Sequence, residues 1–182
     1  MAKLVEQTYG EALFQTAVET NQVDAFLEEV NLIQTVLKQN PQWDGLMRHP
    51  KITKQEKVEI MKGAFGGKIS REMTGFLELI LTKERYGQLQ AVFRYFTDKV
   101  KEEKKIGTAY VTTPMELSEI RKADIQSRLL ATTPYLTMEM HYAVDPSLIG
   151  GMVIRIKDRV VDSSIRTKLA EMKKELLQIQ LG

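Results

Sequence analysis

The stretch LIGGMVIRIKDRVVDSSI, from Leu148 to Ile165, decides the fold of the C-terminal part of the chain. The glycine pair Gly150-Gly151 predicts a sharp bend, because glycine adopts positive φ angles without steric cost. The β-branched residues between Met152 and Ile156 favour a strand. Lys157-Asp158 is a polar break short enough for a hairpin turn. We therefore expect a tight β-hairpin here.

A helix is expected to follow this hairpin. Asp162, Ser163 and Ser164 supply side chains that accept hydrogen bonds from the free backbone N–H groups at a helix start. Apolar residues then recur at helical spacing, and they are Ile165, Leu169, Met172, Leu176 and Ile179. The stretch contains no nucleophile–base pair and no metal-ligand cluster, so its composition is that of a binding or scaffolding module.

Composition limits the classes of protein that fit. The chain has 182 residues, of which 43% are hydrophobic and 27% charged, so it supports a folded core with a soluble surface. The net charge of +2 gives no case for nucleic acid, and the absence of cysteine excludes disulfides and thiolate chemistry. No apolar run approaches the roughly 18 residues that span a bilayer. The N-terminus opens directly into an amphipathic helix, so neither a signal peptide nor a transit segment is expected.

The N-terminal part of the chain reads as a helical bundle. Apolar residues at helical spacing predict six helices joined by short turns. Asn21 is the expected N-cap of the second helix, and Thr53 and Glu56 form an expected capping box before the fourth. The run from Lys99 to Lys105 has no apolar residue after Val100, so we expect the bundle to end there.

Two of these helices have apolar arcs wider than one buried face requires. They are the first, over residues 4–20, and the fifth, over residues 70–85. Leu79 stands at the edge of the fifth helix's arc, next to the bare position Gly75. For the first helix two explanations remain open: a central position in the bundle, or a second face that receives another chain.

The period of the pattern changes after residue 105. A strand over residues 106–112, a helix beginning at a second capping box in Thr113–Glu116, and an alternating strand over residues 136–144 precede the hairpin. The predicted fold class is mainly α with a small α+β part. An N-terminal six-helix bundle over residues 1–105 is followed by a C-terminal domain over residues 106–182, with a small sheet (hairpin) and two helices.

Candidate chemistry is sparse. The sequence GGKIS at Gly66–Ser70 lacks the spacing of a phosphate-binding loop and follows a helix, so it is read as a turn between helices. His49 and His141 each lack a second ligand at helical spacing, which speaks against a metal site. We expect no catalytic, cofactor-binding or metal-binding residues, no cofactor, and no nucleic-acid partner.

Three stretches together resemble the delta subunit of F-type ATP synthases, the family that includes the oligomycin-sensitivity-conferring protein. YGEALFQTA, Tyr9–Ala17, is similar to the family's opening helix YAxALFxxA, with Gly10 in place of the usual alanine. The region from Phe76 into Phe96 is the second. The most specific is Leu148–Leu169, which resembles the family's glycine pair, hairpin and D-x-S helix start.

The resemblance implies a non-catalytic stator part, or peripheral stalk subunit, of the proton-translocating ATP synthase. In this family the helical domain binds the N-terminal helices of the alpha subunits, and the positions that face them match Tyr9, Ala12 and Leu79. The C-terminal domain binds the C-terminal region of the b subunit, and we expect the contact at four residues of the last helix: Ile165, Leu169, Met172 and Leu176.

The expected location is the cytoplasmic face of a bacterial cell membrane, with membrane association only through the complex. A processed organellar chain would have the same sequence features. A free-standing helical adaptor that regulates another complex is the alternative from a different class. The orientation of the two domains and the affinity for the stalk are not readable from the sequence.

Overall fold

The computed structural model describes the backbone of residues 2–179 and the side chains of residues 4–174. The chain divides into two compact units, an N-terminal unit, Met1–Val100, and a C-terminal unit, Lys101–Gly182. The predicted fold class is confirmed, since a helical part is followed by a small sheet with two helices. The boundary expected at Lys105, where two independently folding domains would separate, stays a prediction.

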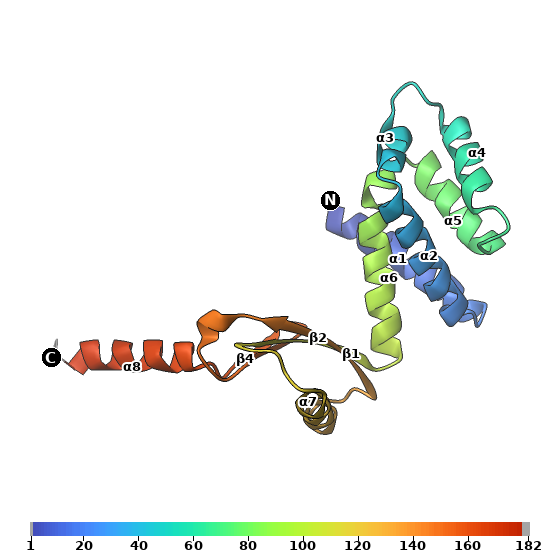
Figure 1. Cartoon of the computed structure of the whole chain (residues 1–182). Helices are drawn as coiled ribbons and strands as arrows, with labels where there is room; N and C mark the ends of the chain where they lie inside the picture. The colour runs from blue at the N-terminus through green and yellow to red at the C-terminus, as the bar shows by residue number, and fades with distance from the viewer. Residues whose placement is uncertain (1, 180–182) are drawn as a thin grey trace. The chain divides into compact units, whose positions relative to one another are not determined.

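The N-terminal unit is built from helices alone within the described residues (Figure 1). Its elements are α1 (Ala2–Glu19), α2 (Val23–Gln39), α3 (Gln42–Arg48), α4 (Lys54–Phe65), α5 (Arg71–Thr82), the 3-10 turn η1 (Tyr86–Gln88) and α6 (Leu89–Glu103). The last turn of α6 belongs to the C-terminal unit, where Lys101 Nζ lies 2.7 Å from Glu139 Oε2.

One apolar core holds these helices together. Phe26 of α2 and Phe93 and Phe96 of α6 are fully buried. Each such side chain contributes on the order of 1.5–3 kcal/mol to folding when it leaves water. Tyr9 of α1 and Phe76 of α5 are partly buried and pack against the same cluster. The core therefore buries part of the wide apolar arc on each of α1 and α5.

Side-chain caps fix the starts of two helices. The expected capping box is present at α4, where Glu56 accepts from the Thr53 N–H at 2.8 Å and Thr53 Oγ1 accepts from the Glu56 N–H at 3.2 Å. These bonds to Thr53 lower the pKa of Glu56. At α5, the Glu29 carboxylate accepts from the Ser70 N–H at 2.7 Å and from its hydroxyl at 2.9 Å, which ties α2 to the start of α5.

Gly10 is a point of close helix contact. A Cβ built on Gly10 would lie 2.4 Å from Cδ1 of Tyr95 on α6, and the Tyr95 hydroxyl donates to Glu11 Oε2 at 2.9 Å. The aromatic ring thus occupies the space that an alanine methyl would need. This contact explains why glycine stands in α1 where helix propensity alone favours alanine.

We expect Gly10→Ala to lower the free energy of unfolding of the N-terminal unit, since overpacking costs about 1–3 kcal/mol. Gly63→Ala in α4 is the matched control, because a Cβ there has no atom within 4 Å. That change should raise the stability by up to about 1 kcal/mol through helix propensity. Urea unfolding followed by the fluorescence of Trp43 measures both. Equal stabilisation by the two changes would contradict the tight contact.

The C-terminal unit contains a four-stranded sheet in the described residues. Its elements are β1 (Ile106–Thr113), α7 (Glu119–Thr132), β2 (Thr137–Val144), the 3-10 turn η2 (Pro146–Leu148), β3 (Val153–Ile156), β4 (Arg159–Asp162) and α8 (Ile165–Ile179). The strand order is β2-β1-β3-β4, with β1 parallel to β2 and antiparallel to β3. The predicted order of strand, helix, strand, hairpin and helix is confirmed.

On one face of the sheet, the register sets apolar residues of β2 and β3 beside those of β1. Ala109 of β1 pairs with Met140 of β2 and with Ile156 of β3. Helix α7 packs on this face, since the Tyr142 hydroxyl donates to the Lys122 carbonyl at 3.2 Å. The expected alternation in β2 is confirmed for Met138, which is buried.

Two local predictions were wrong. Thr113–Glu116 is no capping box: Thr113 ends β1 and donates its hydroxyl to the Met115 carbonyl at 2.7 Å, so α7 begins only after Ser118. Asn21 does not cap α2, because it takes a positive φ of 54° in the turn before Gln22. At Thr113 the pairing of β1 determines the backbone conformation, and at Asn21 it is the turn that ends α1, where the Asn21 N–H donates to the Val18 carbonyl at 3.0 Å.

The hairpin at the centre of the prediction is present, with β3 and β4 antiparallel. Of the glycine pair, only Gly151 has a positive φ, at 76°. A Cβ at Gly151 would lie 2.3 Å from the Ser163 carbonyl oxygen, whereas one at Gly150 would meet the terminal Cδ1 of Ile165 at 2.5 Å. The two glycines therefore serve different purposes, a backbone conformation at Gly151 and side-chain room at Gly150.

Candidate protein-interaction surfaces

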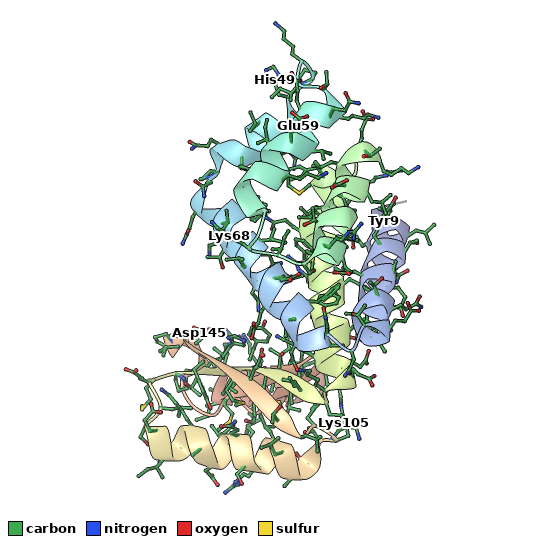
Figure 2. All side chains as sticks on the ribbon, turned by 90° about the vertical axis from the view of Figure 1, so that its right-hand side faces the viewer. Tyr9, His49, Glu59, Lys68, Lys105 and Asp145 are labelled. Atoms are coloured by element: carbon green, nitrogen blue, oxygen red, sulfur yellow. The ribbon has the colours of Figure 1, made fainter. Side chains whose placement is uncertain are left out.

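The residues expected to face the alpha subunit lie on α1 and α5. Ala12 is exposed, and Leu79 is 44% exposed. Tyr9 on α1 is half-buried against the core (Figure 2). The structure thus leaves Ala12 and Leu79 available to another chain, while Tyr9 is shared between the core and the surface.

An exposed row runs along α5 through Gly75, Leu79 and Thr82. A Cβ at Gly75 would have no atom within 4 Å, so the surface beside Leu79 is open. Phe76, on the adjacent side of the helix, packs against the same core as Tyr9 of α1. Leu79 therefore projects from a rigid, well-packed helix rather than from a loop.

The start of α8 is fixed by a network of short hydrogen bonds. Asp162 accepts from the Ser164 N–H at 2.8 Å and from the Thr167 hydroxyl at 2.7 Å. Ser164 is fully buried and its hydroxyl accepts from the Thr167 N–H at 3.2 Å. The bonds to Ser164 lower the pKa of Asp162. The predicted capping is confirmed for Asp162 and Ser164 and fixes the direction in which α8 leaves the sheet, whereas Ser163 was wrongly included, since its hydroxyl donates to the Met152 carbonyl at 2.9 Å.

The apolar residues of α8 are exposed. Ile165, Leu169 and Met172 are 42%, 52% and 57% exposed, and Leu176, the fourth expected contact, lies outside the residues whose side chains are described. Figure 1 shows α8 projecting from the end of the sheet. The apolar stripe of an amphipathic helix is normally buried against neighbouring elements, so this exposed stripe is a candidate docking surface.

A groove beside the hairpin was not expected from the sequence. It has a volume of about 540 Å³ and lies between the end of α7 and the face of β3 and β4. Its apolar lining includes Leu129, Tyr135, Ile154 and Val161. Helix α7 covers only part of the sheet, which leaves this remainder open. The sequence shows apolar residues in β3 and β4, but only the structure shows that α7 leaves this part of the sheet open.

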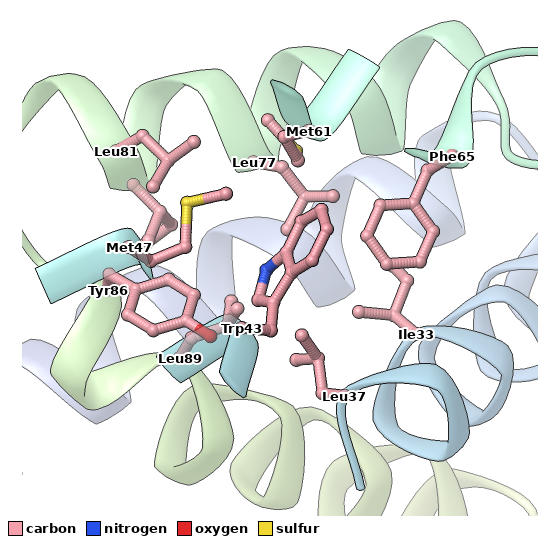
Figure 3. Close-up of a pocket in the computed structure, with 11 residues that line it drawn as sticks. Ile33, Leu37, Trp43, Met47, Met61, Phe65, Leu77, Leu81, Tyr86 and Leu89 are labelled. Carbon is pink, nitrogen blue, oxygen red and sulfur yellow. The ribbon is translucent and has the colours of Figure 1, made fainter. Parts of the chain in front are cut away.

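The N-terminal unit also contains a small apolar cavity, shown in Figure 3 between Trp43, Met47, Phe65 and Tyr86. Its volume is about 10 Å³, which is about the size of one water molecule and too small for an organic ligand. Burial raises the pKa of Tyr86 to about 12, so its hydroxyl is neutral at physiological pH. The cavity is a packing gap in the core.

The described residues contain no group of three or more histidine, cysteine or acidic side chains that could hold a metal ion. His49 follows α3 (Figure 2), and the ring of His141 stacks on that of Tyr110 at 4.9 Å. The sequence at Gly66–Ser70 is the connection between α4 and α5, as expected. Among the described residues, no helix combines the length and apolar character that crossing a membrane requires.

A helical unit with exposed apolar side chains, followed by a small α+β unit whose last helix exposes Ile165, Leu169 and Met172, defines the class of a protein-binding scaffold. Residues 5–176 match the profile of the family described as ATP synthase delta (OSCP) subunit. The chain belongs to this family, whose members are peripheral-stalk components of F-type ATP synthases. The resemblance found in the sequence is thereby confirmed.

Relatives match along their whole length. The ATP synthase subunit delta of Lachnoclostridium phytofermentans is 49% identical, covering 100% of both chains. That of Alkaliphilus metalliredigens is 32% identical, covering 98% of this chain and 99% of the relative. A chain of the mitochondrial ATP synthase hexamer of Toxoplasma gondii has the same fold, with a TM-score of 0.75 at 18% identity, covering 94% of this chain and 97% of that chain.

Proposed function

We propose that this chain is the non-catalytic stator subunit that links the catalytic head of an F-type ATP synthase to its peripheral stalk. The observation that carries the proposal is the match to the delta (OSCP) family over residues 5–176. By holding the head against the stalk, the subunit prevents the head from turning with the rotor, so that rotation is coupled to ATP synthesis.

In this proposal the N-terminal unit binds the N-terminal helices of the alpha subunits. The contact is made by Tyr9, Ala12 and Leu79, of which Ala12 and Leu79 are exposed and Tyr9 is half-buried. A partner helix that lays an apolar face over α1 and α5 would cover Leu79 and the open surface beside Gly75. Burial of such anchor side chains is the usual source of affinity at helix-in-groove contacts.

The C-terminal unit binds the C-terminal region of the b subunit. We assign this contact to Ile165, Leu169, Met172 and Leu176 of α8, because the first three have exposed apolar side chains. The subunit then lies at the cytoplasmic face of the bacterial cell membrane and is held there through the complex. It contributes no catalytic residue and needs no cofactor.

Purification of the enzyme from membranes tests this proposal. The chain should copurify with the alpha and beta subunits and with the b subunit, and washed membranes depleted of it should lose ATP synthesis until the pure chain is added back. A free-standing adaptor for another complex would instead be absent from the purified enzyme, and its removal would leave coupled synthesis unchanged.

A further inference from the structure

The apolar stripe of α8 has the spacing of a coiled coil. Ile165, Leu169 and Met172 follow at intervals of four and three residues, and the sequence continues the pattern with Leu176 and Ile179. This 3.5-residue period places Leu169 and Leu176 at heptad position a and the other three at position d. A stripe restricted to a and d is narrower than the face that a helix buries against a globular core.

The a and d residues of α8 form the seam, and among the described ones Ile165 lies beside Gly150, while Leu169 and Met172 are about half exposed. Between residues 165 and 174 every side chain is exposed except that of Thr167, which is half-buried. Among the described residues, α8 is held at its start, where it packs against η2 and the Arg166 guanidinium donates to Ser147 Oγ at 2.9 Å. The stripe is therefore presented to another molecule.

Charge along the seam indicates the chemistry of that molecule. The flanking e and g positions carry Arg166, Lys168 and Lys173, and the next flanking position in the sequence is Glu175. In a parallel pair of α8 helices Lys168 would face Lys173 of the second copy. In an antiparallel pair Arg166 would face Lys173 while Lys168 would face Glu175, so charge gives a second copy no net advantage. A partner helix with acidic residues at e and g would form favourable pairs with these three bases.

We infer that α8 pairs with one other helix in a coiled coil, and that the apolar a and d residues of this partner helix are flanked by aspartate or glutamate. The inference rests on the proposed function, because in the complex that helix belongs to the b subunit. It adds the packing mode and the charge pattern that the partner must have. The narrow seam without aromatic residues favours a helix over a membrane surface as the occupant.

Two synthetic three-heptad peptides test the inference with the full-length chain. Both carry isoleucine at a and leucine at d; one has glutamate at every e and g position and the other has lysine. In fluorescence anisotropy at low salt, the glutamate peptide should bind at least about tenfold more tightly, and the difference should shrink as salt screens the pairs.

Variants of α8 provide the controls. Arg166→Glu, Lys168→Glu and Lys173→Glu combined should reverse the preference, so that the lysine peptide binds more tightly. Lys174→Glu reverses a single charge at position f, on the side of α8 away from the a and d residues. This variant should still bind the glutamate peptide more tightly. Leu169→Asp should weaken binding of both peptides by about a hundredfold, because it places an unpaired charge in the seam. Circular dichroism of each variant should match the parent chain.

Equal affinity for the two peptides, or a Lys174→Glu change as large as that of the triple variant, would overturn the inference. Stronger binding to vesicles of anionic phospholipid than to either peptide would replace it with a membrane contact. If the wild-type chain copurifies with the ATP synthase but shows no peptide preference, only the coiled coil is wrong. If it does not copurify, the proposed function itself fails.

Discussion

Gly151→Ala should lower the free energy of unfolding of the C-terminal unit by about 2–4 kcal/mol. Two costs add at this position. Alanine disfavours the φ of 76°, and its Cβ would lie 2.3 Å from the Ser163 carbonyl oxygen. That neighbour belongs to the backbone just before α8, so relief of the clash requires displacement of the helix start rather than rotation of a side chain.

Two glycines provide matched controls for this change. Gly67 has the same φ of 76° but no atom within 4 Å of a built Cβ, so Gly67→Ala carries only the conformational cost, about 1 kcal/mol. Gly150→Ala meets only the mobile end of the Ile165 side chain and should also cost little. Hydrogen exchange should report lost protection in β3, β4 and the start of α8 for Gly151→Ala alone. Equal loss in all three variants would contradict the steric argument.

Leu79→Asp should weaken binding of a peptide matching the alpha subunit's N-terminal helix by about tenfold or more, because it places a charge in a desolvated contact. Leu79 is 44% exposed in the free chain, so the thermal unfolding midpoint should change little. Titration calorimetry with the full-length chain measures the affinity.

Leu32→Asp on α2 is the matched control, since Leu32 is 38% exposed and carries no expected contact. It should leave both the affinity and the unfolding midpoint nearly unchanged. If Leu79→Asp unfolds the N-terminal unit, Leu79 is part of the core. If it leaves fold and affinity intact, the alpha subunit binds elsewhere.

Local signals explain which parts of the fold were predictable. The capping box at Thr53 and the cap by Asp162 and Ser164 were predicted correctly because both partners lie within a few residues of each other. The same pattern at Thr113 failed because β1 extends through this residue, and strand pairing outweighs a local cap. A capping pattern in the sequence therefore predicts a helix cap only where strand pairing or a turn does not determine the backbone conformation of the same residues.

Long-range contacts could not be read from the sequence. The bond between Glu29 and Ser70 joins residues 41 positions apart, and neither residue type indicates the other. The ring of Tyr95 against Gly10 is a similar case, since only the packing of α1 on α6 reveals it. For the candidate surfaces, the spacing in α8 predicted an apolar stripe, while its exposure emerged only from the structure.

The strand order β2-β1-β3-β4 also has a consequence for synthesis of the chain. The first strand to leave the ribosome, β1, lies in the middle of the sheet, and both of its neighbours are made later. Helices α4 and α5 follow one another in the chain and pack together, whereas β1 gains its β3 partner only after α7 and β2 have been made. During that interval the edge of β1 that β3 will occupy is unpaired, although β2 is made earlier and can pair with the other edge, so the nascent chain is most prone to aggregation before the hairpin is complete.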